Sequence, residues 1–492
     1  MEKKLKKAEL DDLLRLSQGI RSWLNNQETR CLQTRIIPER YIIDVENSGF
    51  YFGLETKWGK GYFVGKSDKE DGHVLVQGIN GSCKSACIVK PTIETWKSLF
   101  VALDVKGELS EHYHMLERKS LVARKSIVFN PSKGEVHYDP YVMLRKEPQR
   151  FIQYIREITF AIIPKPIDVR DPYWIDMARN LLSAIIAFGY SKGMDFSETM
   201  LFACRYSSSQ ICTYIQNSDC AAAKMFINEF DKLKEEQRAS VYTEMQSYIL
   251  IYATDSDIQE AFSRDGEVFS WDIFAGSTDD TPNVFLCFNQ DALEQWGGMI
   301  RLMITQLIRM LERRPDKHSV DGSKILPLLV LLDKFPLLGK MDVISNALTT
   351  LRSKKVTFGL VIQSIPQLDA IYGKDVRKII LDNCQYKVIL KVTEPDSQEY
   401  LSRMIGNFPT VNKSVSLGSD YEERLYPIGG QLHETREPLV YSHEFAANED
   451  ILLYVDGKLF RTLKLPVCVT KKPVWQFDEI ILRYTERYKN DN

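Results

Sequence analysis

A chain of 492 residues is longer than one ordinary hydrophobic core can use, so its length predicts two or three domains. Its hydrophobic content of 44% and charged content of 26% are those of an ordinary globular protein, which excludes a fibrous or low-complexity chain. A net charge of −2 excludes a protein that is basic overall, although one face or channel can still be basic.

Cysteine usage and hydropathy indicate the compartment. The nine cysteines are odd in number and include no C-x-x-C pair, which indicates neither a disulfide framework nor a zinc site. No apolar run reaches the ~18–20 residues that a membrane-spanning helix needs, and no signal-peptide pattern opens the sequence. We therefore expect reduced thiols and a cytoplasmic protein. Leucines among charged residues predict that residues 1–35 form an amphipathic helix.

The first motif follows a short lead-in. Apolar runs with glycine and aromatic residues between 36 and 66 predict two or three antiparallel strands. A buried strand is expected at His73–Gln77, directly before the octapeptide GINGSCKS at Gly78–Ser85. This octapeptide follows the phosphate-binding pattern G-x-x-x-x-G-K-[ST] at all positions but one, and a helix is expected to start at Ala86–Lys90.

A loop between a strand and a helix binds phosphate because backbone N–H groups and the helix N-terminus point at the anion. Lys84 is expected to contact the β- and γ-phosphates, and Ser85 is expected to hold Mg²⁺. The exception is Cys83, which stands where the pattern has glycine. Its side chain is expected to crowd a backbone that needs glycine's freedom at positive φ. The residues expected to bind nucleotide are Gly78, Asn80, Gly81, Ser82, Cys83, Lys84 and Ser85.

Two further strands are expected at Ser98–Leu103 and Ser126–Asn130. The first is almost wholly apolar, as a buried parallel strand should be, and acidic residues follow it. Open α/β sheets bind ligands at the carboxyl ends of their strands, so Asp104 is expected to support the sheet edge beside the nucleotide. His112 and His114 are expected to lie in a solvated turn.

The pattern changes between residues 144 and 265. Strand signals disappear there, and apolar residues recur with helical periodicity. This stretch predicts an all-helical domain inserted between two parts of an α/β fold.

The α/β pattern then resumes. A strand at Asn283–Phe288 precedes a long helix at about 292–313, and the apolar run Ile325–Leu332 ends in Asp333. An acid at this place orders the Mg²⁺ shell in phosphate-loop NTPases, so Asp333 is predicted to serve Mg²⁺. The following position commonly holds a glutamate that polarises the attacking water. Here it is Lys334, which cannot act as a general base while it is charged.

The next predicted strand, Val356–Ile362, ends in Gln363, a polar residue that can sense or position the γ-phosphate. The alternation is expected to continue at 379–383 and 388–392, and residues from about 408 to 470 predict short strands. The predicted units are an N-terminal helix (1–35), the first part of the nucleotide-binding domain (36–143), the helical insertion (144–265), the second part of the nucleotide-binding domain (266–470) and a polar tail (471–492).

In their order and spacing, these motifs resemble those of the coupling proteins of type IV secretion and conjugation systems, the TraG/TraD group. The resemblance spans about residues 73–470 and includes the helical insertion. The matching pieces are HVLV with GINGSCKS at 73–85, LDVKGE at 103–108, NP and YDP within 130–140, LLDKFPLLG at 331–339, VIQSIPQL with IYG within 361–373, and REPL at 436–439.

The resemblance implies an α/β fold: a RecA-like P-loop nucleotide-binding domain with an inserted all-alpha domain. It implies ATP and Mg²⁺ as cofactors. It also implies homo-hexameric rings at the inner membrane that deliver single-stranded DNA, relaxosome proteins or effector proteins to the type IV secretion channel proteins. Asp333 and Gln363 would serve catalysis, and Arg352 is a candidate arginine finger acting on a neighbouring subunit. A solvated charge beside Lys354 and Lys355 is the alternative interpretation of Arg352.

Three departures from the family pattern leave more than one function open. Cys83 and Lys334 alter both halves of one ATP site, which predicts slow or absent hydrolysis. The membrane-spanning N-terminus of many members is not found, so the protein is expected to be cytoplasmic and peripheral at the inner membrane. One function is an ATP-driven coupling motor, and another is a pseudo-ATPase that serves as a docking platform. The pattern at 333–339 argues against a third, a DNA pump of the FtsK/HerA kind.

Overall fold

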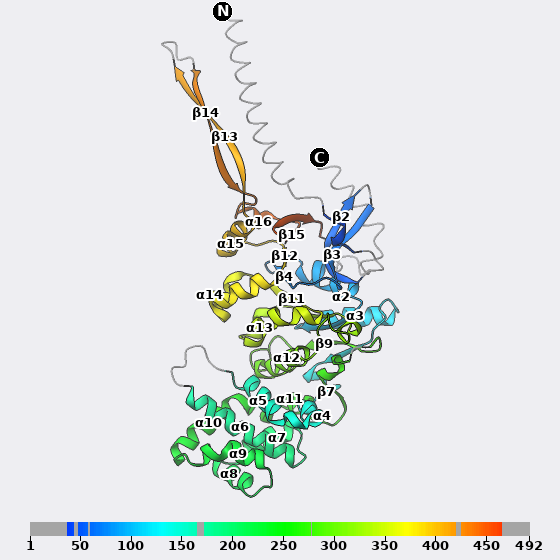
Figure 1. Cartoon of the computed structure of the whole chain (residues 1–492), viewed down its shortest axis with the longest axis vertical. Helices are drawn as coiled ribbons and strands as arrows, with labels where there is room; N and C mark the ends of the chain where they lie inside the picture. The colour runs from blue at the N-terminus through cyan, green and yellow to red at the C-terminus, as the bar shows by residue number, and fades with distance from the viewer. Residues whose placement is uncertain are drawn as a thin grey trace, which may run out of the picture.

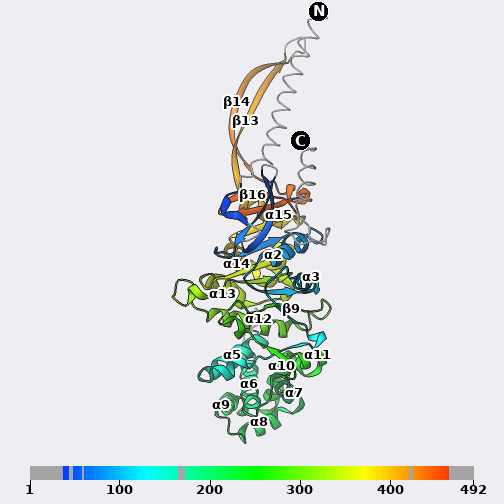
Figure 2. The same ribbon diagram turned by 90° about the vertical axis from the view of Figure 1, so that its right-hand side faces the viewer.

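The computed structural model describes residues 37–43, 48–57, 60–164, 172–276, 278–419 and 425–464. The helix predicted for 1–35 and the tail predicted for 471–492 lie outside the described residues. The described part is elongated, with a helical block at one end, a large sheet in the middle and a β-hairpin projecting from the other end (Figures 1 and 2). In the described residues, no helix has the length and hydropathy needed to span a membrane.

The largest sheet of the described residues has nine strands in the order β16-β15-β12-β4-β11-β10-β5-β9-β6. The seven strands from β12 to β6 are parallel, and β15 and β16 extend the sheet with antiparallel pairs. Their bounds are β4 (Val74–Gln77), β5 (Leu99–Asp104), β6 (Ser126–Phe129), β9 (Asn283–Cys287), β10 (Leu328–Leu332), β11 (Val356–Ile362), β12 (Tyr386–Ile389), β15 (Ile451–Val455) and β16 (Lys458–Thr462).

The parallel strands are apolar because both faces of the sheet are covered. Successive side chains point to opposite faces: Leu75 and Val101 belong to one hydrophobic cluster, whereas Val76 and Phe100 belong to another. Helices α12 (Gly297–Glu312), α13 (Asp342–Thr350) and α14 (Ile365–Asn383) contribute to the first cluster. The second contains residues of α2 (Lys90–Thr95), α3 (Glu108–Arg118) and two lead-in strands, β2 (Gly49–Lys57) and β3 (Lys60–Ser67), which pair with the short strand β1 (Ile42–Ile43).

The three lead-in strands form a small antiparallel sheet in the order β1-β3-β2, as the sequence predicted. This sheet holds the helix that follows the phosphate-binding loop pattern. The Thr92 hydroxyl of α2 accepts a hydrogen bond from Tyr51 N, and the Thr95 hydroxyl donates to Gly49 O. The lead-in strands therefore fix the position of α2 against the central sheet.

The helical block begins and ends beside a two-stranded parallel sheet, β7 (Val136–Tyr138) with β8 (Glu267–Phe269). Between these strands the described residues are helical or connecting segments. Several helices start at side-chain caps, as at Asp195 and Ser207, which accept hydrogen bonds from the backbone N–H three residues on. The helices are α4 (Val142–Lys146), α5 (Phe151–Ile162), α6 (Tyr173–Ser191), α7 (Phe196–Arg205), α8 (Ser208–Gln216), α9 (Ala221–Asp231), α10 (Glu235–Thr254) and α11 (Ser256–Ala261).

The C-terminal part differs from the prediction of short strands. After α15 (Pro395–Ile405), β13 (Asn407–Ser419) and β14 (Leu425–Pro438) pair with each other and form the long hairpin that leaves the body in Figures 1 and 2. Glycine and proline in this stretch predict interrupted strands, but a ribbon with two open edges tolerates proline, and the register shifts near Pro427. Helix α16 (Glu444–Ala447) leads back to the sheet.

The expected alternation continues, because residues 379–383 belong to helix α14, with Ile380 and Leu381 buried and Ile379 45% exposed, and β12 follows. One local prediction is wrong. His112 and His114 lie on α3 and not in a solvated turn. The His112 ring contacts the buried carboxylate of Glu94 at 2.5 Å.

Candidate nucleotide-binding site

The predicted site residues gather at the carboxyl edge of the parallel strands. β11 lies between β4 and β10, so the loop after β4 and the acid after β10 are two strands apart, with the end of β11 between them. This is the edge at which parallel α/β sheets bind ligands. The edge therefore brings together the octapeptide at 78–85, Asp333 and Gln363.

The loop turns tightly at its first glycine. Gly78 N donates to Ile362 O of β11, and a Cβ at Gly78 would lie 2.6 Å from Ser82 Oγ, so no larger residue fits without movement. The buried Ser82 hydroxyl donates to Ile79 O at 2.7 Å and closes the turn. Gly81 has φ +78°, and no heavy atom lies within 4 Å of a Cβ built there, so the loop opens toward solvent at this point.

Cys83 adopts the backbone conformation that the pattern reserves for glycine. Its φ is +68°, in the left-handed region that L-residues with a Cβ populate at a penalty of about 1–2 kcal/mol. Its thiol is exposed beside the loop. A single π-helical turn, Ser85–Val89, follows and runs into α2. The predicted strain at Cys83 is therefore present, and the loop keeps its turn despite it.

Lys84 points into the loop. Its ammonium donates to Gly78 O at 2.5 Å and to Ile79 O at 2.9 Å. Burial lowers the pKa of Lys84, the nearby Asp333 carboxylate opposes this shift, and the Lys334 charge adds to it. An ammonium held between loop carbonyls is placed where the backbone of such a loop surrounds phosphate oxygens.

Ser85 and Asp333 meet across the end of β11. The Ser85 hydroxyl lies 3.4 Å from Asp333 Oδ2. Asp333 is 9% exposed, and burial raises its pKa while the charges of Lys334 and Lys84 lower it. A serine hydroxyl and a carboxylate oxygen are the hard ligands that Mg²⁺ takes together with phosphate oxygens and water. The donor set therefore fits Mg²⁺ bound with a nucleotide.

Gln363 connects the strand between them to the loop. Its amide Nε2 donates to Asn80 Oδ1 at 2.8 Å. Gln363 is partly exposed at the end of β11. An amide in contact with the loop can respond to a change in the phosphates that the loop holds, which is the role expected of a sensor residue.

Lys334 occupies the position after Asp333 in a second left-handed conformation, with φ 57° and ψ 41°. Its ammonium lies 3.5 Å from Gln290 Oε1, in the loop after β9. The side chain therefore extends from the end of β10 along the carboxyl edge. It presents a positive charge where the related pattern presents a carboxylate.

Asp104, at the end of β5, has a structural role that the sequence did not reveal. The pairing of Leu103 with Leu332 puts Asp104 level with Asp333 on neighbouring strands. Its Oδ2 accepts hydrogen bonds from Leu109 N, Ser110 N and the Ser110 hydroxyl, so it caps α3. A signal was present, because an acid followed by glycine and a helical run is typical of a helix start.

Arg352 is not brought to this site within its own chain. It lies in a 3₁₀ turn, Leu351–Lys354, directly before β11, at the amino edge of the sheet. Its Nε is 3.8 Å from Asp71 Oδ2, and its side chain is 58% exposed. Because strands β4 and β11 run parallel, Arg352 and the loop lie at opposite ends of them. Any contact of Arg352 with a nucleotide must be made to another copy.

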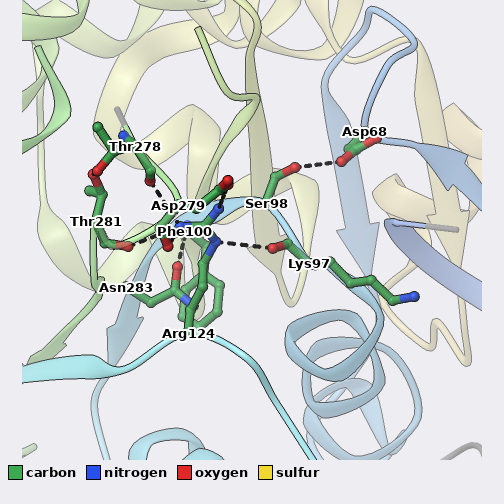
Figure 3. A network of polar contacts seen from close by, with 9 residues as sticks. All are labelled: Asp68, Lys97, Ser98, Phe100, Arg124, Thr278, Asp279, Thr281 and Asn283. Atoms are coloured by element: carbon green, nitrogen blue, oxygen red, sulfur yellow. Dashed lines mark hydrogen bonds and ion pairs between the residues drawn. The ribbon is translucent and has the colours of Figure 1, made fainter. Parts of the chain in front are cut away.

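The amino edge is held together by polar contacts of its own (Figure 3). Arg124 is 9% exposed and donates to the carbonyl oxygens of Lys97, Thr278, Asp279 and Thr281 at 2.8–3.2 Å. These carbonyls belong to segments that lead into β5 and β9. Arg124 therefore joins two loops at the edge away from the candidate site.

A family model described as Type IV secretory system Conjugative DNA transfer matches residues 22–453. The chain is 25% identical over 397 residues to Protein VirD4 of Agrobacterium fabrum, a match covering 77% of this chain and 56% of VirD4. It is 22% identical over 426 residues to Conjugal transfer protein TraG of Escherichia coli, covering 81% of this chain and 64% of TraG. The chain thus spans between half and two thirds of the length of these relatives.

Two solved structures share the fold. The plasmid coupling protein TrwB in complex with ADP and Mg²⁺ aligns with a TM-score of 0.64 at 16% identity, covering 88% of this chain and 94% of TrwB. TrwB in complex with the ATP analogue ADPNP gives a TM-score of 0.64 at 15% identity over 88% of this chain and 93% of TrwB. The predicted fold class, a RecA-like nucleotide-binding fold with a helical insertion, is confirmed.

Proposed function

Because the chain belongs to the type IV secretory system conjugative DNA transfer family, we propose that it is a coupling protein whose carboxyl-edge site binds ATP with Mg²⁺. One observation carries this proposal: the Ser85 hydroxyl lies 3.4 Å from Asp333, so the loop and the acid strand form one site. The titles of the TrwB structures name ADP with Mg²⁺ and an ATP analogue, which supports the same ligands here.

Each residue of the site has a part in this function. The loop from Gly78 holds the phosphates with its backbone N–H groups, and Lys84 supplies positive charge to them. Ser85 and Asp333 would hold Mg²⁺, which when bound would offset the negative charge of the phosphates. Gln363 couples the state of the loop to β11 through Asn80.

The partners follow from the family. We propose that the protein recruits single-stranded DNA, or relaxosome and effector proteins, to the secretion channel at the inner membrane. The helical block at the end far from the hairpin is the proposed docking domain for these substrates. A homo-hexameric ring is proposed because Arg352 is exposed and separated from its own site, as a residue that acts on a neighbouring copy would be.

A second function is favoured by two residues of the site. Cys83 strains the loop, and Lys334 removes the acid that activates water, which lowers rates by a factor of ~10²–10⁴ in comparable sites. We therefore propose slow turnover for this chain. In the limiting case it is a pseudo-ATPase that binds nucleotide and serves as a docking platform.

Nucleotide binding and ATP hydrolysis are measured separately. ATP hydrolysis is followed with and without single-stranded DNA for the parent, Cys83→Gly, Lys334→Glu and the double variant. The control is Lys340→Glu, in the same connection but paired with Asp342. We expect the double variant to exceed the parent by about 10²-fold or more, with no gain in the control. Failure of the parent and of every variant to bind nucleotide would refute the function.

A further inference from the structure

Lys334 lies at the carboxyl edge, and the family pattern offers no role for a lysine at its position. It follows the metal-site acid directly, and its left-handed backbone turns the chain sharply after β10. A lysine gains nothing from this conformation locally, since a glycine or an asparagine adopts it with less strain. The residue is therefore explained neither by the turn nor by general-base chemistry.

The order of residues along the edge locates its ammonium. The strands run β4, β11, β10, β5, β9, and they end respectively in the loop, Gln363, Asp333, Asp104 and the segment with Gln290. Ser85 and Asp333 are the residues that would hold Mg²⁺ beside the terminal phosphates. Lys334 reaches beyond Asp333, to within 3.5 Å of Gln290. Its ammonium therefore lies beyond Asp333 as seen from the loop, the side on which we expect the terminal phosphate of a nucleotide.

The charged side chains around Asp333 favour the binding of an anion. Lys84 and Lys334 are close enough to influence each other, and Asp333 is the acid near both. The Asp104 carboxylate is engaged by three donors at the start of α3. Among the described residues, the Lys334 ammonium contacts the neutral amide of Gln290 at 3.5 Å, the long limit for a hydrogen bond. Two lysines thus face a position that carries one available carboxylate.

We propose that Lys334 is a γ-phosphate-binding residue, which makes the site selective for nucleoside triphosphate over diphosphate and partly replaces Mg²⁺. The proposal rests on the function proposed above, because it assigns a ligand contact within that nucleotide site. The terminal phosphate is the most highly charged part of a nucleoside triphosphate, so a lysine can form a charge-assisted contact with it. ADP lacks this phosphate and cannot form the contact. A family glutamate here would repel the same group and would make the metal indispensable.

The experiment measures the affinities of ADPNP and ADP by calorimetry, each with Mg²⁺ and with EDTA. The variants are Lys334→Gln, which removes the charge, and Lys334→Arg, which keeps it. Lys340→Gln is the matched control, a lysine six residues on that pairs with Asp342. Thermal melting of each variant checks that it is folded.

We expect Lys334→Gln to lower the affinity for ADPNP about tenfold and the affinity for ADP less than about threefold. The loss of ADPNP affinity should be larger in EDTA than with Mg²⁺. Lys334→Arg and Lys340→Gln should stay within about threefold of the parent. Equal losses for both nucleotides, or no loss, overturns the proposal while leaving the nucleotide site in place. A parent chain that binds neither nucleotide refutes the proposed function and this inference together.

Discussion

At the scale of single residues, Cys83 shows how one side chain can alter a motif without removing its shape. The loop keeps its turn because Gly78 leaves room for Ser82 and Gly81 adopts φ +78°, while Cys83 takes the other left-handed position at φ 68°. The sequence predicted this strain because the pattern specifies glycine there. It could not predict the Gln363–Asn80 contact, which depends on how β11 is placed beside β4.

The backbone strain at Cys83 can be relieved by glycine. Cys83→Gly should raise the free energy of unfolding by about 1 kcal/mol, because glycine adopts positive φ without the Cβ penalty. It should also tighten nucleotide binding, since the phosphate-facing backbone is no longer crowded. Urea denaturation and calorimetry measure the two effects.

Ser120 supplies the matched control, because it is a second non-glycine residue at positive φ (54°), in the turn after α3. Ser120→Gly should stabilise the fold by a similar amount and leave nucleotide affinity unchanged. Equal gains in affinity for both variants would mean that the effect of Cys83 is not local to the phosphates.

At the scale of elements, His73 joins three segments. Its Nδ1 accepts from Phe358 N of β11, so its Nε2 donates to Leu348 O of α13 at 2.8 Å. Burial lowers the pKa of His73 to about 4. The sequence placed His73 at the start of a strand, but the tautomer and its partners follow only from the packing of α13.

The neutral state of His73 makes the stability of the fold depend on pH. The unfolded histidine has a pKa of about 6.5, so between about pH 6.5 and 4 the unfolded chain takes up a proton that the folded chain does not. Stability should therefore fall as the pH falls through this window, by ~3 kcal/mol from this residue.

His73→Gln should remove that part of the slope in denaturant unfolding followed from pH 7 to 4. His318→Gln, at an exposed histidine, should leave it unchanged. An identical slope in His73→Gln and the parent would show that His73 does not stay neutral in the fold.

The loops of the amino edge depend on Arg124. Removing its guanidinium leaves the carbonyls of Lys97, Thr278, Asp279 and Thr281 without this donor (Figure 3). Arg124→Ala should lower the free energy of unfolding by about 2–3 kcal/mol, whereas Arg118→Ala, at an exposed arginine of α3, should change it little. Nucleotide affinity should be unaffected, because the network lies at the opposite edge from the loop. A loss of affinity without a loss of stability would contradict this division of the sheet.

The sequence predicted most elements but not all. Strands with both faces buried, such as Val356–Ile362, coincide with their apolar runs, because no polar face complicates the pattern. The run at 379–383 could not be assigned to a helix or a strand, since three apolar residues fit both equally, and the structure places it in α14. The length of β13 and β14 was also missed, because glycine and proline do not break a ribbon with open edges.

At the scale of the whole molecule, the chain carries its nucleotide site on one edge of the sheet and Arg352 on the other. The helical insertion could be predicted from a change of periodicity. The order of nine strands could not, because pairing between distant segments leaves no local signal. All residues of the proposed nucleotide site come from one chain, whereas Arg352 lies at the opposite edge and could reach such a site only on another chain.

A mixing experiment tests that separation. In a Cys83→Gly/Lys334→Glu background, chains with Lys84→Ala and chains with Arg352→Ala should each be inactive in ATP hydrolysis. A mixed ring contains interfaces with an intact loop on one copy and an intact Arg352 on the next. An equal mixture should therefore regain roughly a quarter of the turnover, one half multiplied by one half. No recovery in a mixture shown by native mass spectrometry to contain mixed rings would exclude Arg352 as the residue acting in trans.

The central claim is that the loop at Gly78–Ser85 and Asp333 form one nucleotide site. The most direct test is calorimetric titration of the parent and of Lys84→Ala with ADPNP and Mg²⁺. We expect the parent to bind one nucleotide per chain with saturation, and Lys84→Ala to bind with an affinity at least about tenfold lower. Both proteins should melt as folded chains. No binding by the folded parent, or equal binding by Lys84→Ala, would contradict it.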